Sequence, residues 1–262
     1  MPAPSPSIGF DALRVTYAGG VDAVAGVTLE IAGGSFVALV GQSGSGKSTL
    51  LKTINRLVAP SAGRVTIDGA DVGDEEPHAL RRRIGYVFQN VGLFPHMTVG
   101  ENIAIGLRLA GRRDPARVGD LLDLVELPRD LAARMPDALS GGQRQRVGVA
   151  RALATEPRLL LMDEPFGALD PVTRDALGRS IHSLHQRLGL TTVMVTHDIA
   201  EALLLATRVL VMSAGRIVAD ETPAALVAGH GGEEAAALVA VPRAQAELLG
   251  ELERGAAAAG TR

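Results

Sequence analysis

The feature that most constrains the fold of this chain is a glycine-rich loop between an apolar run and a segment of helical periodicity. The loop, Gly41–Thr49, matches the pattern G-x-x-x-x-G-K-[ST]. The apolar run before it, Phe36–Val40, is short and predicts a buried strand. After the loop, apolar residues recur at helical spacing: Leu50, Leu51, Ile54, Leu57 and Val58. The loop therefore joins a strand to a helix.

This strand, loop and helix form the context in which the pattern, known as the Walker A phosphate loop, binds a nucleoside triphosphate. Glycines let backbone amides turn inward around a polyphosphate, and the helix N-terminus adds a partial positive charge. Lys47 can reach the β- and γ-phosphates, and the Ser48 hydroxyl can ligate Mg²⁺. The candidate nucleotide-binding residues are Gly41, Gln42, Ser43, Gly44, Ser45, Gly46, Lys47, Ser48 and Thr49. The loop alone does not say what the nucleotide is used for.

Length and composition exclude several classes of protein. The 262 residues suffice for one large α/β domain, or for one domain with a smaller appendage. Hydrophobic residues make up 47% of the chain, which excludes general disorder, and the net charge of −3 argues against a nucleic-acid binder held by bulk electrostatics. The absence of cysteine excludes disulfides and thiolate metal sites. We see neither a secretory signal nor an apolar run of ~18 residues, so we expect a cytoplasmic chain.

Two segments before the loop alternate in the manner of half-buried strands. They are Ala12–Tyr17 and Val24–Ile31, with a turn at Ala18–Gly20. The ring of Tyr17 could stack on an adenine or could simply lie at a sheet edge. Residues 1–7, rich in proline and serine, are predicted to be a disordered tail.

Beyond the phosphate loop, Arg64–Gly69 reads as a strand with a tight turn, and Ile84–Phe88 reads as a strand that ends at Gln89. A glutamine at the carboxyl end of a strand can point into a ligand crevice. The charge run Arg81–Arg83 is interpreted as a solvated face.

From about residue 91 to residue 150 the pattern predicts a small helical subdomain inserted into the α/β core. Asn102–Leu109 and Val118–Leu127 are apolar at helical spacing, and Gly111–Pro115 separates them. The apolar loop Gly92–Met97 could dock another protein or could fold onto its own helices.

A second anion site is predicted at Leu139–Gln143. Ser140 can cap a helix that begins at Gly141, and the two glycines leave the first amides of that helix bare. The candidate residues are Ser140, Gly141, Gly142 and Gln143.

Two carboxylates follow the apolar run Arg158–Met162, which reads as a strand buried on both faces. In a phosphate-loop protein the first carboxylate, Asp163, reaches Mg²⁺, and the second, Glu164, can orient or deprotonate a water. The alternative is a pair of surface acids at a strand end. His197 follows another buried strand, Thr191–Thr196, and is predicted to face the γ-phosphate.

The last part of the chain contains a predicted hairpin at Val209–Val218. The sequence from Thr222 is alanine-rich and helical in pattern, with an interruption at Gly229–Gly232. Residues 229–262 are predicted to form a short helical C-terminal tail.

Taken in order, these motifs resemble the ATP-binding subunit of ABC transporters over about residues 8–226. The most specific part is Leu139–Gln143, because other phosphate-loop ATPases lack it. The resemblance implies a phosphate-loop NTPase core with a mostly parallel sheet flanked by helices. It also implies an N-terminal antiparallel β subdomain and the inserted α-helical subdomain. We assign the nucleotide-binding domain to residues 8–228.

The resemblance also implies roles for residues at matching positions. Tyr17 would be the adenine-stacking ring, and Asp170 would be an acid near the nucleotide. Asp163 would hold Mg²⁺ with Ser48, and Gln89 would be a further Mg²⁺ ligand that senses the permease. Glu164 would be the catalytic base and His197 the switch histidine. The implied cofactors are ATP and Mg²⁺.

The partners implied by the resemblance are a second ATPase domain, an integral membrane permease and an extracytoplasmic substrate-binding protein. Two ATPase domains, from a homodimer or a pair of related chains, would face head to tail. Each ATP would lie between one phosphate loop and the partner's Leu139–Gln143. The chain would lie at the cytoplasmic face of the membrane, and no nucleic acid is expected.

Within the family, residues 54–57, 92–99 and 162–171 resemble importers of glycine betaine, choline, carnitine and related quaternary amines. Gln42 stands where proline is frequent, and Met135 and Ala138 stand where tyrosine and glutamate are frequent. The resemblance implies an ATPase that energises osmoprotectant import. Alternatives are an ABC importer for another solute, such as an amino acid or an anion, and a non-transport ABC ATPase in translation or DNA repair.

Overall fold

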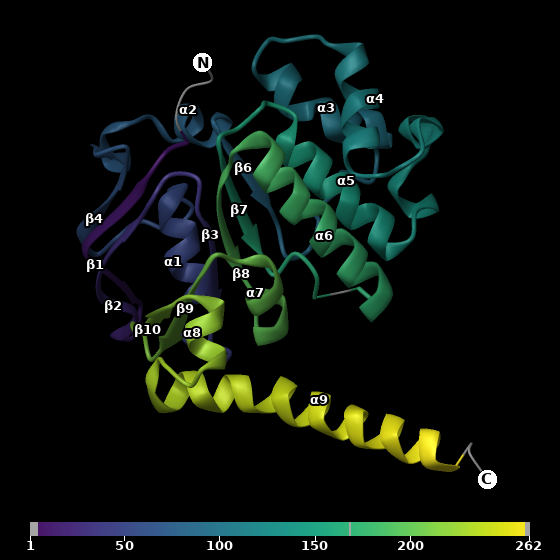
Figure 1. Cartoon of the computed structure of the whole chain (residues 1–262). Coiled ribbons are helices and arrows are strands. Elements are labelled where there is room, and N and C mark those ends of the chain that lie inside the picture. The colour runs from purple at the N-terminus through teal and green to yellow at the C-terminus, as the bar shows by residue number, and fades with distance from the viewer. Residues whose placement is uncertain (1–4, 168, 260–262) are drawn as a thin grey trace.

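The fold is organised around two β-sheets (Figure 1). The computed structural model describes residues 5–167 and 169–259, with side chains through residue 252. One sheet has six strands in the order β10-β9-β3-β8-β7-β6, and the other has four in the order β2-β1-β4-β5.

The six-stranded sheet is parallel except at one edge, where β10 runs antiparallel to β9. Its strands are β3 (Phe36–Val40), β6 (Ile84–Val87), β7 (Leu159–Asp163), β8 (Thr191–Val195), β9 (Arg208–Ser213) and β10 (Arg216–Glu221). Every residue of β3, β7 and β8 is buried. A strand covered on both faces reads as a mainly apolar run. β3 and most of β7 show this pattern, whereas β8 begins with two buried threonines.

The four-stranded sheet is antiparallel and forms the predicted N-terminal β subdomain. Its strands are β1 (Ile8–Tyr17), β2 (Val21–Ile31), β4 (Ala62–Ile67) and β5 (Ala70–Asp71). β1 begins earlier than the predicted start at Ala12. Ala12 has a left-handed φ of 45°, and the register shifts between Phe10 and Leu13. This bulge breaks the alternation on which the sequence prediction relied.

Helices cover both faces of the six-stranded sheet. They are α1 (Lys47–Ile54), α2 (Pro77–Arg82), α3 (Val99–Leu109), α4 (Pro115–Leu124), α5 (Gly141–Leu153), α6 (Pro171–Leu188), α7 (Ile199–Leu205), α8 (Pro223–Val227) and α9 (Gly232–Ala259). Short 3₁₀ turns lie at Val72–Asp74, Arg129–Ala133 and Pro136–Ala138. The predicted inserted helices are α3, α4 and the start of α5, which group at one end of the molecule (Figure 1).

Two apolar cores lie on opposite faces of the six-stranded sheet. Val37 and Leu39 of β3 face a core shared with α1 and the four-stranded sheet. Phe36, Ala38 and Val40 face a core shared with α3, α5, α6, α7 and the start of α9. Because strand side chains alternate, β3 is anchored on both faces, and the loop that follows it starts from a fixed point.

The two ends of the chain differ from the sequence predictions. Ser5–Ser7, part of the predicted disordered tail, are held: Thr191 Oγ1 donates to Pro6 O at 2.6 Å, and Ser7 N donates to Asp68 Oδ1 at 2.8 Å. These contacts join residues far apart in sequence, which local composition does not reveal. Residues 1–4 of that tail lie outside the described residues.

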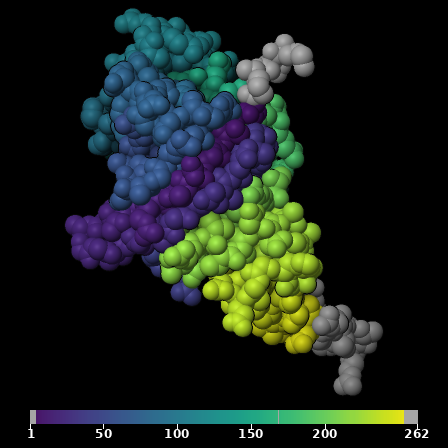
Figure 2. Space-filling model, turned by 90° about the vertical axis from the view of Figure 1, so that its left-hand side faces the viewer, coloured from purple at the N-terminus to yellow at the C-terminus, as the bar shows by residue number. Residues whose placement is uncertain are grey.

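The C-terminal tail is a long helix rather than a short one. The first turns of α9 pack on the rest of the chain through Ala235 and Val239, which are buried, and the distal part of α9 projects from the body (Figure 1). Figure 2 shows this C-terminal region at the opposite end of the molecule from the inserted helices, with the N-terminal strands between them. Residues 260–262 of the predicted tail lie outside the described residues.

Over the described part of the chain, we find no helix with the length and apolar character needed to cross a membrane.

Candidate functional site

The phosphate loop requires glycine at two places where the backbone approaches other segments closely. Gly41 and Gly46 have positive φ angles of 145° and 103°. A Cβ on Gly41 would lie 2.1 Å from Met212 O, and one on Gly46 would lie 2.0 Å from Ala23 O. α1 begins at Lys47, directly behind Gly46, with no side-chain cap. The N-terminal amides of α1 are therefore left for a ligand.

Lys47 is buried inside the loop. Its Nζ donates to Gly41 O at 2.8 Å, Gln42 O at 2.7 Å and Ser45 Oγ at 3.2 Å. Burial lowers the pKa of the Lys47 amine, and the nearby carboxylates of Glu164 and Asp163 oppose that shift. The loop thus holds a cation in the position where a polyphosphate would lie.

Asp163 is the centre of a network at the end of β7, and it is only 2% exposed. Ser48 Oγ donates to Asp163 Oδ1 at 2.7 Å, and Lys52 Nζ lies 2.9 Å from Oδ2. Tyr86 OH also donates to Oδ2, at 3.3 Å. Burial raises the pKa of Tyr86, and the Asp163 charge raises it further. A carboxylate buried to this extent is costly without partners, and these three contacts supply them.

The residues predicted to hold Mg²⁺ supply the right type of donor. Ser48 and Asp163 place two oxygen ligands side by side, and Mg²⁺ prefers oxygen ligands, several of them water or phosphate. The described residues contain no group of three or more His, Cys, Asp or Glu side chains that could form a complete metal cage. These two oxygens therefore fit a Mg²⁺ whose other ligands would be water or phosphate.

The structure brings together Glu164, Gln89 and His197, three of the candidate residues, while their predicted roles stay predictions. Gln89 Nε2 donates to Glu164 Oε2 at 2.9 Å, and His197 Nδ1 lies 3.5 Å from the same oxygen. The backbone of Glu164 is left-handed, with φ of 46°, and its N–H donates to Val195 O at 2.9 Å. The Glu164 and His197 side chains are 24% and 62% exposed. A carboxylate and an imidazole thus reach solvent next to the buried Asp163.

Tyr17 lies at the end of β1, next to α1. Its hydroxyl is 3.2 Å from Thr49 Oγ1, and the residue is 48% exposed. Because β1 lies between β2 and β4, Tyr17 is at the end of an interior strand and not at the edge of the sheet, with its hydroxyl beside the start of α1. Stacking of its ring on an adenine stays a prediction.

The second predicted anion site is the N-terminus of α5. A capping box closes it: Ser140 Oγ accepts from Gln143 N at 3.2 Å, and Gln143 Oε1 accepts from Ser140 N at 2.9 Å. In the part of the chain that the structure describes, no acceptor takes the amides of Gly141 and Gly142. Ser140 and Gly141 are exposed, so the predicted anion site is accessible from outside the chain.

Asp170 is placed differently from the other candidates. Its Oδ1 accepts from Val172 N at 3.1 Å and from Thr173 N at 3.0 Å, so Asp170 is the N-cap of α6. Hydrogen bonds from Thr173 lower the pKa of its carboxyl group. An aspartate before a proline at a helix start is a capping signal that the sequence analysis did not use. Its predicted role near the nucleotide stays a prediction.

Lys52 and Tyr86 are site residues that the sequence analysis missed. Lys52 lies on α1, and Tyr86 lies on β6, directly opposite Leu161 of β7 in the sheet. The link of Tyr86 to Asp163 depends on the pairing of β6 with β7, and the link of Lys52 depends on the packing of α1 beside β7. No local pattern indicates either.

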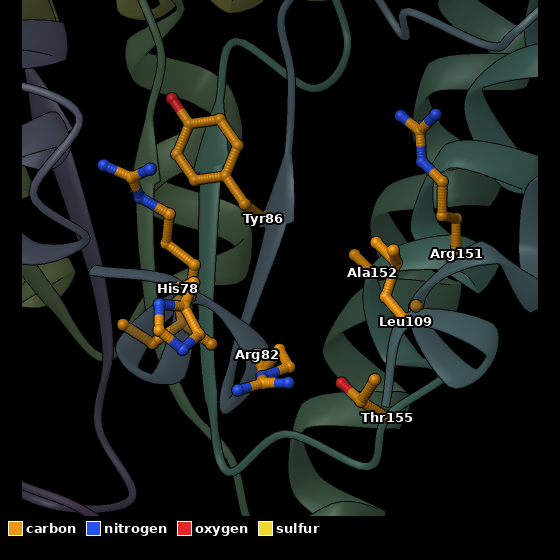
Figure 3. A pocket seen from close by; sticks show the side chains of 10 residues that line it. His78, Arg82, Tyr86, Leu109, Arg151, Ala152 and Thr155 are labelled. Carbon is orange, nitrogen blue, oxygen red and sulfur yellow. The ribbon is translucent and has the colours of Figure 1, made fainter. Parts of the chain in front are cut away.

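A cleft of about 440 Å³ lies between α2 and β6 on one side and α3 and α5 on the other (Figure 3). Its lining includes His78, Arg82, Tyr86, Leu109 and Arg151. Because Tyr86 lines this cleft and also binds Asp163, the cleft is connected to the site by one side chain.

Comparison with known proteins places these features in a family. A family profile described as "ABC transporter" matches residues 24–167. The choline transport ATP-binding protein of Bacillus subtilis is 51% identical over 211 residues, 79% of this chain and 55% of that protein. The glycine betaine uptake system ATP-binding protein of Escherichia coli is 49% identical over 208 residues, 78% of this chain and 68% of that protein.

A third relative is named for a different solute. The sulfate/thiosulfate import ATP-binding protein of Yersinia pseudotuberculosis is 50% identical over 214 residues, 79% of this chain and 58% of that protein. The chain thus spans little more than half the length of the choline and sulfate relatives.

Among solved structures, a dimeric ATP-binding cassette in a post-hydrolysis state, bound to ADP and phosphate, is similar with a TM-score of 0.76. It is 35% identical, and the match covers 82% of this chain and 98% of that cassette.

Proposed function

The chain belongs to the ABC transporter family, and on that premise we propose that it hydrolyses ATP to energise import of a quaternary amine through a separate membrane permease. The observation that supports this most directly is the convergence of Lys47, Ser48, Asp163, Glu164 and His197 at the carboxyl ends of β3, β7 and β8.

The residues of this site divide the chemistry among them. Lys47 leaves its carbonyl partners to pair with the β- and γ-phosphates. Glu164 orients and deprotonates the attacking water, and His197, 3.5 Å from Glu164, holds the γ-phosphate. Mg²⁺, held by Ser48, Asp163 and Gln89, would neutralise charge on the phosphates. Positioning and electrostatics account for most of the rate in phosphoryl transfer, and a preassembled network provides both.

We further propose that two copies act together, head to tail, with the Ser140–Gln143 corner of each completing the site of the other. The exposed Ser140 and the open amides of Gly141 and Gly142 support this, because they offer an anion site that one chain leaves accessible. Asp170, at the start of α6, would lie at the same interface.

The permease is proposed to dock at the cleft beside α2 and α3. Tyr86 and Gln89 lie on one segment, between this cleft and the site residues Asp163 and Glu164. Movement of the docked segment would therefore reach the carboxylates directly. Phe88 and Phe94, which are 45% and 41% exposed, provide apolar surface nearby. On this proposal the chain would lie at the cytoplasmic face of the membrane.

The solute is proposed by similarity, because it would not touch this chain. The Bacillus subtilis and Escherichia coli relatives named for choline and glycine betaine support a quaternary amine. The relative named for sulfate/thiosulfate supports an anion as the second candidate.

Reconstitution of the chain with its permease and an extracytoplasmic substrate-binding protein tests this proposal. ATP-dependent uptake of labelled glycine betaine or choline into vesicles is expected, and vesicles that contain Glu164→Gln should show none. Uptake of sulfate without uptake of either amine would replace the first candidate with the second. Hydrolysis of ATP without uptake of any solute would reject a transport role.

A further inference from the structure

We propose that Arg174 is a positioning residue for ATP hydrolysis, because it ties the turn that contains His197 to the segment that follows Glu164. This inference rests on the proposed function, since it assumes that Glu164 and His197 act together on ATP.

The two side chains come from separate segments. Glu164 follows β7 and His197 follows β8, which are neighbouring parallel strands. One backbone hydrogen bond joins the segments at the strand ends, from Glu164 N to Val195 O at 2.9 Å. One such bond fixes a point but not an orientation, so a second connection is needed to hold Glu164 Oε2 and His197 Nδ1 at 3.5 Å.

Arg174, in the first turn of α6, provides that second connection. Its Nη2 donates to Leu169 O at 3.2 Å, which fixes the backbone just before Asp170. On the other side its Nη1 donates to Asp198 Oδ2 at 3.3 Å, and its Nε lies 3.5 Å from Glu201 Oε1. The contact with Glu201 is an ion pair without the geometry of a hydrogen bond. The rigid, forked guanidinium can reach both segments at once.

The turn around His197 is held through the same carboxylates. Thr196 Oγ1 accepts from Asp198 N at 3.0 Å and donates to Glu201 Oε2 at 2.5 Å. Asp198 Oδ1 accepts from Ala200 N at 2.8 Å and so caps α7. Both sequence neighbours of His197 are therefore fixed, while the His197 side chain itself is 62% exposed. This is the arrangement expected for a side chain that must meet a ligand from a fixed backbone position.

The charges of the cluster indicate what the loss of Arg174 would do. The Glu201 side chain is only 11% exposed, and burial raises the pKa of its carboxyl group. Asp198 lies close enough to raise that pKa further, and the guanidinium of Arg174 opposes it. Without Arg174, two carboxylates on one helical turn would face each other with one of them buried, and the turn would move to separate them.

Arg179 offers a matched comparison on the same helix. Among the residues that the structure describes, it pairs only with Asp175, one turn away on α6, and the two side chains are 70% and 54% exposed. That pair connects nothing outside α6, so its removal is expected to be neutral.

The test compares Arg174→Met, Arg174→Lys and Arg179→Met in the full chain. Steady-state phosphate release gives kcat, and equilibrium binding of a fluorescent ATP analogue gives affinity. For Arg174→Met, kcat should fall on the order of tenfold to a hundredfold, as for a small misplacement of reacting groups, with affinity changed less than about twofold. Arg174→Lys should recover part of the rate, because it keeps the charge but not the fork. Arg179→Met should match the unsubstituted chain.

Several results would overturn the proposal. A wild-type kcat in Arg174→Met would do so, and so would equal losses of kcat and affinity. If Arg174→Met does not fold, the comparison moves to Arg174→Lys and Glu201→Gln, which keep the side-chain volumes. Both should lower kcat at unchanged affinity, and wild-type values in both would reject the inference. An unsubstituted chain without ATPase activity would remove the proposed function and this inference together, whereas an active chain with a neutral Arg174→Met removes only the inference.

Discussion

The N-termini of α1 and α5 are both suited to an anion, but they differ in how much of a site surrounds them. α1 starts behind a glycine with no side-chain cap, and its first residue, Lys47, is buried. α5 starts behind Ser140 in a capping box, at an exposed corner of the chain. Besides its own Lys47, the site at the start of α1 contains two carboxylates, a glutamine and a histidine from other segments. α5 offers amides and a hydroxyl group.

The difference indicates that the N-termini of α1 and α5 have different roles. The α1 end can select and bind a nucleotide within one chain, because its ligands come from strands that the core holds in place. The α5 end stabilises its own helix first and keeps only the Gly141 and Gly142 amides for an anion. Such a corner gains a ligand only when another molecule presents one, which is the physical argument for a two-chain site.

The largest effect is expected from Glu164→Gln, which leaves both helix ends intact and removes the proposed catalytic base. ATP hydrolysis should fall on the order of a hundredfold to a thousandfold, while ATP binding stays. The variant should then accumulate as a dimer in ATP, measured by light scattering after chromatography. A monomeric or fully active Glu164→Gln protein would contradict this comparison of the two helix ends. It would mean that the N-terminus of α5 does not bind the ATP held by a second copy.

Lys47→Met should act on the α1 end alone. It removes the cation that pairs with the phosphates, so ATP affinity measured by calorimetry should fall about tenfold to a hundredfold, the equivalent of a charged hydrogen bond. Arg108→Met, at the far end of α3, serves as a control for the loss of a positive charge. Unchanged affinity in Lys47→Met would mean that the loop is not the primary nucleotide site.

Gly142→Ala should act on the α5 end alone. Its Cβ would lie 2.5 Å from Thr173 Cγ2, so the start of α5 must shift away from α6. We expect ATPase activity to fall about tenfold at unchanged nucleotide affinity. Thr173→Ser removes the colliding methyl group and keeps the hydroxyl, so the double variant should recover activity. A double variant as slow as Gly142→Ala would place the defect elsewhere.

Ser140→Ala should have the smallest effect. Loss of the cap should lower the free energy of unfolding by about 1 kcal/mol in urea titrations. Thr98→Ala is the matched control, because Thr98 forms the same capping box with Glu101 at the start of α3. The two variants should lose similar stability, but only Ser140→Ala should also lose ATPase activity. Equal activity in both would reduce the role of Ser140 to capping.

The sequence predicted those parts of the site whose chemistry requires contiguous residues. The phosphate loop, the Asp163–Glu164 pair and the Ser140 cap each depend on neighbours in the chain, so their patterns identify them. The mostly parallel core was implied by the family resemblance, and the structure confirms it. The apolar runs at β3 and β7 predicted strands that are buried on both faces.

Other parts depend on contacts between distant segments and could not be predicted. Tyr86 reaches Asp163 only because β6 pairs with β7, and Arg174 reaches Glu201 only because α6 packs beside α7. The charge run Arg81–Arg83, interpreted as a solvated face, is largely partnered: Arg81 donates to the backbone of Asn55 at 3.0 Å, and Arg83 pairs with Glu75 at 2.7 Å. Charge patterns show where cations occur, but not which carbonyl or carboxylate the fold brings to them.

The left-handed backbone at Glu164 has a consequence for protein engineering. A residue with a side chain gives up roughly 1 to 3 kcal/mol in such a conformation, and glycine does not. A screen for heat resistance would therefore favour Glu164→Gly, and the selected variants would be stable proteins that cannot hydrolyse ATP. At this position heat stability and ATP hydrolysis are in conflict, so variants selected for one property should also be measured for the other.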